Sequence, residues 1–261
     1  MRFTIIALSL ILAMSGAMAK VHHPNRIKHL DTPAAFSSAS YIIAGNDGII
    51  LKEHDSDLQR PIASISKLMV GLLAASQDLD EALPIPTIRT VHSNIPRKQA
   101  TLTRKELLAM ALMQSDNFAA QILCNNIPNC VDAMNDKAKE LDMLHTHYAE
   151  PTGLSIENVS TASDLLKLMI IASTNQTITR LSSMPHAEIH SGKNTIMVRN
   201  TNPLTAKFDV ILSKTGFTNP AGGCIVMAVN SPFGQRFIVL LGSRNTHTRI
   251  PEMEKLYREM S

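Results

Sequence analysis

The distribution of hydrophobic and polar positions along the chain predicts strands toward both ends and helices between them. Short runs rich in branched apolar residues predict strands at 39–43, 49–52, 195–198, 210–214, 225–229 and 237–241. Apolar positions with helical spacing predict helices at 64–75, 103–113, 117–124, 131–141 and 161–172, and a last helix from about Pro251. The pattern favours an α/β (α+β) fold, with an antiparallel sheet built from both chain ends and an all-helical subdomain inserted at about 64–180.

Local signals support several of these boundaries. Asn46-Asp47-Gly48 is typical of a hairpin turn, and Ser231-Pro-Phe-Gly234 of a turn between antiparallel neighbours. Thr103 and Glu106 have the spacing of a capping box, which opens a helix. The helix at 64–75 is apolar on nearly every face beyond its first turn, so we expect it to be buried.

The first residues have the pattern of a secretory signal peptide. Arg2 precedes an apolar run over 3–14, and Ala17-Met18-Ala19 supplies the small residues after which such leaders are cleaved. We therefore expect a leader at 1–19 and a single domain at 20–261 that is exported, soluble and without a stable membrane anchor. An uncleaved anchor is the alternative, because the apolar run approaches the lower length for crossing a bilayer.

Composition and charge exclude several classes of protein. Hydrophobic residues make up 44% of the 261 residues and charged residues 18%, which is typical of a globular chain. The net charge is only +3, which argues against a nucleic-acid partner. Tryptophan is absent and aromatic residues make up 4%, so a stacking platform for bases is not expected.

The three cysteines fit an exported protein without defining their pairing. Cys124 and Cys130 are close enough in sequence for a disulfide, but spacing alone does not fix the geometry, and two free thiols remain the alternative. Cys224 lies in an apolar strand pattern and is expected to be buried and unpaired. No cysteine or histidine spacing is typical of a zinc site, so we expect no metal.

The segment Ser64-Ile-Ser-Lys67 carries the first candidate chemistry. A serine hydroxyl needs a base within hydrogen-bond reach to act as a nucleophile at neutral pH. Residues three apart share a helix face, and burial lowers the pKa of a lysine amine so that it can accept a proton. Ser64 is therefore a candidate nucleophile and Lys67 its candidate base. The alternative is a helix-capping serine followed by an exposed lysine.

Two further motifs lie at element boundaries. Ser115-Asp116-Asn117 falls between two predicted helices, where a hydroxyl can relay a proton and an amide can hold a substrate amide, although these residue types also form plain helix caps. Lys214-Thr215-Gly216 ends a predicted strand. A cation, a hydroxyl and a glycine that permits close backbone approach suit a substrate carboxylate. A solvent-exposed lysine at a strand exit is the alternative.

In this order, the three motifs resemble those of the serine penicillin-binding proteins. The segments similar to the low-molecular-weight D-alanyl-D-alanine carboxypeptidases and endopeptidases cover nearly the whole mature chain, at 61–69, 113–117, 150–155, 199–204 and 212–217. Ser66 stands where threonine is usual in that family. The resemblance implies a β-lactamase/transpeptidase-like fold and no cofactor.

The resemblance also implies catalytic roles. Ser64 would attack the carbonyl of a D-alanine residue and form an acyl-enzyme, and Lys67 would take its proton. Ser115 would pass a proton to the leaving nitrogen. The backbone N–H groups of Ser64 and Phe217 would form the oxyanion hole.

Binding roles follow from the same resemblance. Asn117 would orient the peptide, and Lys214, Thr215 and Gly216 would hold a carboxylate on the leaving side. The implied partners are peptidoglycan stem peptides in the periplasm, with β-lactams as covalent inhibitors.

The branch of the family is less directly implied. Little chain follows Gly216, whereas carboxypeptidases of this kind usually add a C-terminal domain and an amphipathic helix, so we expect an endopeptidase first and a carboxypeptidase second. A class A β-lactamase would carry a Glu-x-x-Leu-Asn segment, which Glu150-Pro-Thr-Gly-Leu does not match. A catalytically silent wall-binding protein is the alternative from another class.

Overall fold

The computed structural model describes residues 36–259, apart from 89–90, 97–98 and 192–193. The predicted leader at 1–19 therefore lies outside the described residues, as do residues 20–35 of the predicted domain. Residues 36–261 form one compact unit. Among the described residues, no helix has both the length and the hydrophobicity needed to cross a membrane.

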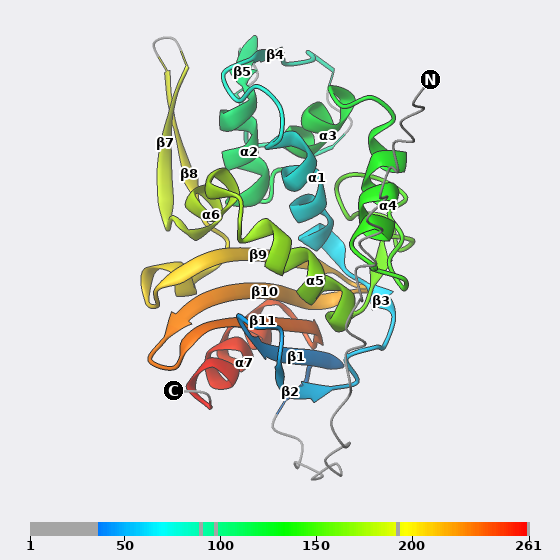
Figure 1. The fold of residues 1–261 in the computed structure, drawn as a ribbon. Helices are drawn as coiled ribbons and strands as arrows, with labels where there is room; N and C mark the ends of the chain where they lie inside the picture. Colours follow the sequence, from blue (N-terminus) through cyan, green and yellow to red (C-terminus); the bar gives the residue numbers. More distant parts are fainter. Residues whose placement is uncertain (1–35, 89–90, 97–98, 192–193, 260–261) are drawn as a thin grey trace, which may run out of the picture. The chain divides into compact units, whose positions relative to one another are not determined.

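An antiparallel five-stranded sheet combines strands from both ends of the chain (Figure 1). Its strands are β1 (Ser40–Gly45), β2 (Ile50–His54), β9 (Val210–Thr218), β10 (Gly222–Ser231) and β11 (Gly234–Ser243), in the order β2-β1-β11-β10-β9. In the pairing of β1 with β11, Ile43 lies opposite Ile238. The expected sheet from both chain ends is confirmed, and so is the turn between β10 and β11, which the Ser231–Gly234 pair closes.

A helical block occupies the middle of the chain, as predicted. Its helices are α1 (Lys67–Ala74), α2 (Arg104–Leu112), α3 (Asn117–Asn125), α4 (Cys130–Glu140), α5 (Ala162–Ala172) and α6 (Gln176–Ser183). The 3-10 turn η1 (Ala63–Ser66) precedes α1, and a second 3-10 turn η2 (Pro203–Ala206) precedes β9. Helix α2 begins with the expected capping box, in which the Thr103 hydroxyl accepts from the Glu106 N–H and the Glu106 carboxylate accepts from the Thr103 N–H.

Short strand pairs and one helix within the middle of the chain were not predicted. The pairs are β3 (Arg60–Pro61) with β6 (Val159–Ser160), β4 (Ala82–Pro84) with β5 (Thr101–Thr103), and β7 (His186–Ser191) with β8 (Asn194–Arg199). The predicted strand at 195–198 is part of β8, which pairs with β7 in a hairpin apart from the main sheet. Helix α6 was missed because it is short and mostly polar.

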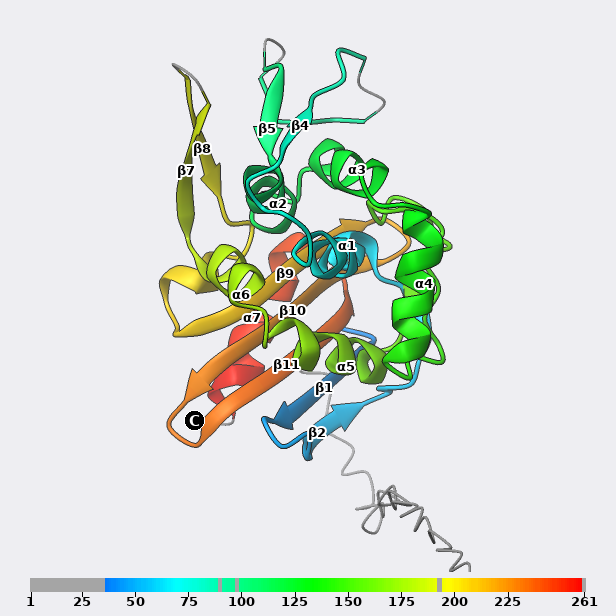
Figure 2. The same cartoon turned by 45° about the horizontal axis from the view of Figure 1, so that its top comes forward.

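Helices cover both faces of the sheet (Figure 2). On one face α5 packs against β1 and β11, and α6 against β9; on the other α7 (Thr246–Arg258) packs against β10 and β11. The predicted start of the last helix near Pro251 is wrong by about one turn. The helix begins earlier because the Asn245 side chain accepts hydrogen bonds from the N–H groups of His247 and Thr248.

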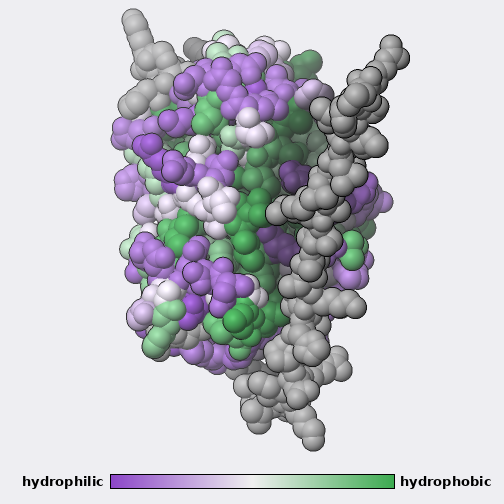
Figure 3. All heavy atoms as spheres, in the orientation of Figure 1, coloured by the Kyte–Doolittle hydropathy of each residue, from purple (hydrophilic) through white to green (hydrophobic). Residues whose placement is uncertain are grey.

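The interior is apolar on both sides of the sheet. Met253 and Leu256 of α7 are fully buried against a cluster that includes Ile43, Ile238 and Leu240. On the opposite side a larger cluster joins the sheet to the helical block. Figure 3 shows a band of hydrophobic residues between hydrophilic margins on the face seen in Figure 1.

Cys124 and Cys130 form a disulfide that links the end of α3 to the start of α4. Of the two alternatives left open by the sequence, the structure therefore has the bridge. Cys224 in β10 is free and buried, as expected.

Candidate active site

Ser64 and Lys67 meet at the transition from η1 to α1. The predicted helix at 64–75 begins as a 3-10 turn, in which residues three apart lie directly above one another. The Lys67 Nζ atom lies 2.7 Å from the Ser64 Oγ atom. Ala63, which precedes the serine, has a φ of 49°, a strained conformation for a residue with a side chain. The local backbone thus holds the hydroxyl beside the amine.

The Lys67 amine is surrounded by oxygen atoms and removed from water. Its Nζ donates to the Asn117 Oδ1 atom at 2.7 Å and to the Thr152 carbonyl at 2.6 Å, and the residue has no exposed surface. Burial lowers the pKa of Lys67 to about 7, against the opposing effect of the Glu150 and Asp116 carboxylates. The exposed lysine considered as an alternative is excluded.

A second amine–hydroxyl pair lies across the site. Ser115 sits between α2 and α3 with a φ of 60°, and its Oγ atom accepts a hydrogen bond of 2.8 Å from the Lys214 Nζ atom. Lys214 is buried, so the solvent-exposed alternative for this lysine is excluded as well. Its burial holds the pKa of Lys214 well below the usual range, and the charges of Lys67 and Arg249 lower it further.

Asp116, between the two motif residues, has a structural place. Its carboxylate caps α3 by accepting from the Ala119 N–H, and it also accepts from the Ser93 hydroxyl and the Asn94 N–H. The helix-cap alternative thus holds for this residue. The cap fixes the loop around residues 93–94 against the motif and leaves Ser115 and Asn117 to contact the two lysines.

Lys214, Thr215 and Gly216 lie within β9, one of the two edge strands of the sheet. The strand continues to Thr218, beyond the predicted end, because its last residues still pair with β10. A Cβ on Gly216 would lie 2.9 Å from the Ser64 backbone nitrogen. The glycine therefore permits close approach of the chain's own η1 turn, which places Ser64 against the strand that carries Lys214 and Phe217.

The sequence analysis missed the residues that shape the loop beside Lys67. The Glu150 carboxylate accepts from the N–H groups of Thr152, Gly153 and Ser155 and from the Thr152 hydroxyl. This network shapes the loop whose Thr152 carbonyl contacts Lys67. Glu150 lies in a segment noted only for its resemblance, and no periodicity or spacing indicates a buried carboxylate there.

Asn158 ties the same loop to η1. Its side-chain amide donates to the Ser66 hydroxyl at 2.9 Å and to the Glu150 carbonyl, and its Oδ1 atom accepts from the Ala149 and Glu150 N–H groups. Ser66, where threonine is usual in the family that the sequence resembles, thus has a buried hydrogen-bond partner. Asn158 is fully buried, and its role is to hold the loop at Glu150 against η1.

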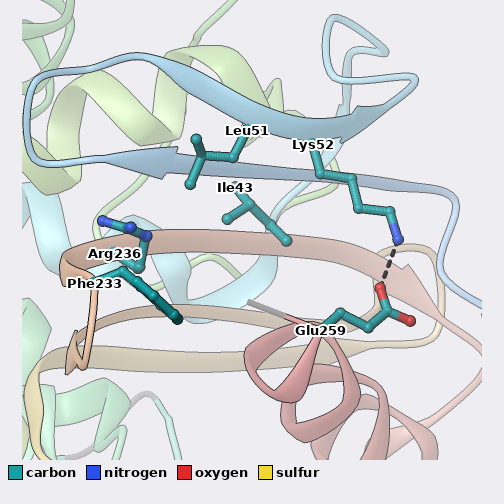
Figure 4. A pocket seen from close by; sticks show the side chains of 6 residues that line it. All are labelled: Ile43, Leu51, Lys52, Phe233, Arg236 and Glu259. Carbon is teal, nitrogen blue, oxygen red and sulfur yellow. Dashed lines mark hydrogen bonds and ion pairs between the residues drawn. The ribbon is translucent and has the colours of Figure 1, made fainter. Parts of the chain in front are cut away.

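A groove of about 520 Å³ on another part of the surface has no comparable chemistry (Figure 4). Its lining residues are Ile43, Leu51, Lys52, Phe233, Arg236 and Glu259. Lys52 and Glu259 form an ion pair of 2.6 Å, and no hydroxyl or thiol nucleophile lines the groove. The candidate active site is therefore the one around Ser64.

Comparisons with known proteins show the family of the chain. The model of the D-alanyl-D-alanine carboxypeptidase family matches residues 27–244. The chain is 36% identical to the D-alanyl-D-alanine endopeptidase of Escherichia coli (strain K12), over 98% of this chain and 87% of that protein. It is 35% identical to the D-alanyl-D-alanine endopeptidase of Pseudomonas aeruginosa, over 96% and 86%.

Solved structures have the same fold. Penicillin-binding protein D2 of Listeria monocytogenes in its ampicillin-bound form superposes with a TM-score of 0.78 and 26% identity, covering 87% of this chain and 98% of that one. The Streptomyces K15 DD-transpeptidase has a TM-score of 0.81 at 21% identity, with coverage of 87% and 98%, a likeness of fold alone.

Proposed function

Because the chain belongs to the D-alanyl-D-alanine carboxypeptidase family, we propose that it is a serine D,D-endopeptidase that hydrolyses the D-alanyl–diaminopimelate cross-links of peptidoglycan. The observation that carries this proposal is the contact of 2.7 Å between a buried lysine amine and the Ser64 hydroxyl. A lysine whose pKa lies near 7 is partly neutral at neutral pH and can accept the serine proton.

Acylation begins at Ser64. As the Ser64 oxygen attacks the D-alanine carbonyl carbon, its proton passes to the Lys67 amine and the carbonyl oxygen becomes an oxyanion. The N–H groups of Ser64 and Phe217 stabilise that oxyanion, a contribution of about 3 kcal/mol for a single well-placed donor. Collapse of the intermediate breaks the bond from carbon to the leaving nitrogen and leaves an ester on Ser64.

The leaving nitrogen must receive a proton before it departs. Ser115 is suited to this step because its hydroxyl is hydrogen-bonded to the buried Lys214 amine. Ser115 passes its proton to the leaving amine and recovers the one that Lys67 took from Ser64, directly or by way of Lys214, so that Lys67 becomes neutral again. Thr215 and Lys214 hold a carboxylate on the leaving side, while Asn117 positions the peptide. Water then hydrolyses the ester, with Lys67 again as base.

The names of the curated relatives favour the endopeptidase over the carboxypeptidase. Two relatives that match over nearly the whole chain are named D-alanyl-D-alanine endopeptidase. The chemistry at Ser64 is the same in either case, since only the leaving amine differs: a diaminopimelate side chain in a cross-link, or free D-alanine at a peptide end.

The geometry of Glu150 argues against a β-lactamase. Each of its two carboxylate oxygens accepts two hydrogen bonds from the chain itself, which leaves neither free to activate a water. We therefore expect slow hydrolysis of a penicilloyl ester on Ser64, so that penicillins act as covalent inhibitors. The predicted leader supports a periplasmic location for this activity.

The experiment compares two substrates with one enzyme. The mature chain is incubated with purified cross-linked muropeptide dimers or with pentapeptide monomers, and product masses are read. We expect dimers to be split into monomers. Release of D-alanine without cleavage of dimers would replace the endopeptidase by the carboxypeptidase.

The Ser64→Ala variant is the control for catalysis. A fluorescent penicillin should label the wild-type chain and remain attached, and it should not label S64A. Equal muropeptide turnover by S64A and wild type would contradict the acyl-enzyme, and rapid release of the label would indicate a β-lactamase. A wild-type chain that binds muropeptides without cleaving either substrate or taking the label would be a wall-binding protein.

A further inference from the structure

Arg249 projects from the start of α7 toward the active-site strand. The side chain is buried, with 9% of the residue's surface exposed. Its Nη1 atom donates a hydrogen bond of 2.7 Å to the carbonyl oxygen of Gly216, on the far side of β9 from η1. None of the three motifs contains this arginine, and the sequence gives it no role in the chemistry at Ser64.

The carbonyl that Arg249 binds belongs to the peptide bond between Gly216 and Phe217. A trans peptide is planar, so its C=O and N–H point in opposite directions. With the oxygen directed at the buried guanidinium, the Phe217 N–H points to the opposite edge of β9. The η1 turn packs against β9 at this residue, since a Cβ on Gly216 would lie 2.9 Å from the Ser64 nitrogen.

We propose that Arg249 is a positioning residue for acylation: by holding the Gly216 carbonyl, it aims the Phe217 N–H at the developing oxyanion. The inference rests on the proposed function, because it requires an acyl-enzyme on Ser64. A hydrogen bond from a cation to the carbonyl also polarises the amide and strengthens its N–H as a donor.

Arg249 has one unpaired donor, as Arg60 does, but its charge also acts on a lysine of the site. Its Nε atom is buried and has no hydrogen-bond partner among the described residues, an arrangement that costs free energy on folding. Its charge acts on the neighbouring Lys214 and lowers the pKa of that amine, so the two groups belong to one electrostatic unit. Arg249 thus touches the reaction only through Gly216 and Lys214.

Arg60 offers a matched control. It is also a partly buried arginine near the end of β9, its Nη2 atom donates to a backbone carbonyl, that of Ala221, at 3.2 Å, and its Nε atom is likewise buried and unpartnered among the described residues. The peptide that it binds lies in the turn between β9 and β10 and carries no predicted oxyanion donor. Loss of Arg60 should therefore disturb folding to a similar degree without touching the oxyanion hole.

The test measures the acyl-enzyme itself. Mature wild-type, Arg249→Met, Arg249→Lys and Arg60→Met chains are acylated with a penicillin whose β-lactam carbonyl carbon is ¹³C, and the ester carbonyl stretch is recorded by difference infrared spectroscopy. Donors at the carbonyl oxygen weaken the C=O bond and lower its frequency. Acylation rates with fluorescent penicillin and thermal unfolding are measured in parallel.

We expect R249M to acylate about 10- to 100-fold more slowly and its ester band to move to higher frequency. R249K should fall between R249M and wild type in both measurements, because lysine keeps the charge and one donor but not the planar fork. R60M should keep the wild-type band. If R249M does not fold, the frequency of the ester carbonyl band in R249K tests the proposal instead.

Two results would overturn the proposal. One is a wild-type ester band in R249M, or in R249K where R249M does not fold. The other is an equal band shift in R60M, which would trace the effect to packing. A wild-type chain that penicillin does not acylate would instead overturn the proposed function.

Discussion

The amine of Lys67 faces three oxygen atoms, and two of them can only accept hydrogen bonds. The Asn117 amide oxygen and the Thr152 carbonyl each take one hydrogen from Nζ. A neutral amine has two hydrogens and one lone pair, so its lone pair is left facing the Ser64 hydroxyl at 2.7 Å. The two carbonyl groups therefore orient the base as well as bind it.

The acylation rate should depend on pH through this amine. Lys67 with a pKa of about 7 is protonated and inactive as a base at pH 5, and is largely neutral at pH 8, where a lysine with its ordinary pKa would still carry the proton. We expect the acylation rate constant for a fluorescent penicillin to rise from pH 5 to 8 with a midpoint near 7. A midpoint near 10 would contradict the buried neutral base.

The Lys67→Arg variant is the control for that profile. A guanidinium stays protonated across the whole range, so acylation should be lost at every pH. Retained acylation with the wild-type midpoint would assign the titration to another group, of which the neighbouring Lys214 is the first to test.

At this scale the sequence predicted the residues that the structure brings together at the candidate site, and it missed those that hold them. Ser64 and Lys67 could be predicted from their spacing, because residues three apart share a helix face. Glu150 and Asn158 were not, since their hydrogen bonds go to backbone groups and to Ser66, and such contacts leave no periodic signal. The contact between Arg249 and Gly216 joins positions far apart in the chain and is visible only once the chain is folded.

Among the elements, η1 is the one whose position decides the site. It is pressed between the edge of β9 at Gly216 and the loop at Gly153. A Cβ on Gly153 would come within 1.9 Å of the Ala63 carbonyl oxygen, and one on Gly216 would come within 2.9 Å of the Ser64 nitrogen. Two glycines on opposite sides thus leave space for the turn that carries the serine.

The Gly153→Ala variant should lose both stability and acylation. Gly153 has a φ of +80°, and Gly48 in the β1–β2 turn has a φ of +77° with nothing within 4 Å of its Cβ position. G48A should lose about 1–2 kcal/mol through backbone strain alone and acylate normally. G153A should lose about 1–3 kcal/mol more and acylate at least tenfold more slowly, because η1 must move.

Denaturant unfolding and penicillin labelling compare the two variants. Since both replace a glycine of positive φ, the difference between them isolates the contact with η1. Equal stability and equal acylation rates would show that the close approach of Gly153 to Ala63 does not position Ser64.

The elements with a clear period or cap were predictable, and the short ones were not. The central strands and the helices α1 to α5 carry apolar patterns long enough to identify. Strands of two or three residues such as β3 and β6 have no pattern of their own and exist because η1 and its loop pack there. Helix α7 begins before Pro251 because Asn245 caps it, a signal that the proline obscured.

At the scale of the whole molecule, the helical block and α7 both pack against the same sheet, on opposite faces. Leu256 of α7 is fully buried in the cluster against the far face, and the active-site lysine Lys214 comes from a strand of the same sheet. If packing between α7 and the sheet is lost, we expect the strands to shift, and Lys214 in β9 to shift with them.

The Leu256→Ala variant should lower the free energy of unfolding by about 2–5 kcal/mol through lost burial and the cavity left behind. Arg258→Ala, on the exposed side of the same helix, removes only a surface ion pair with Glu254 and should change stability by less than about 1 kcal/mol. Circular dichroism and penicillin labelling should fall at the same denaturant concentration in L256A. Loss of labelling well before loss of secondary structure would separate the site from the core.

The pairing of β1 with β11 has a consequence for the timing of activity. A chain synthesised from its N-terminus presents β1 early, yet β11, one of the two strands that pair with β1, is made only after the helical block, β9 and β10. Ser64 and Lys67 likewise wait for β9, which supplies Lys214 and the edge beside η1. We therefore expect a nascent chain that still lacks β9 to β11 to be inactive.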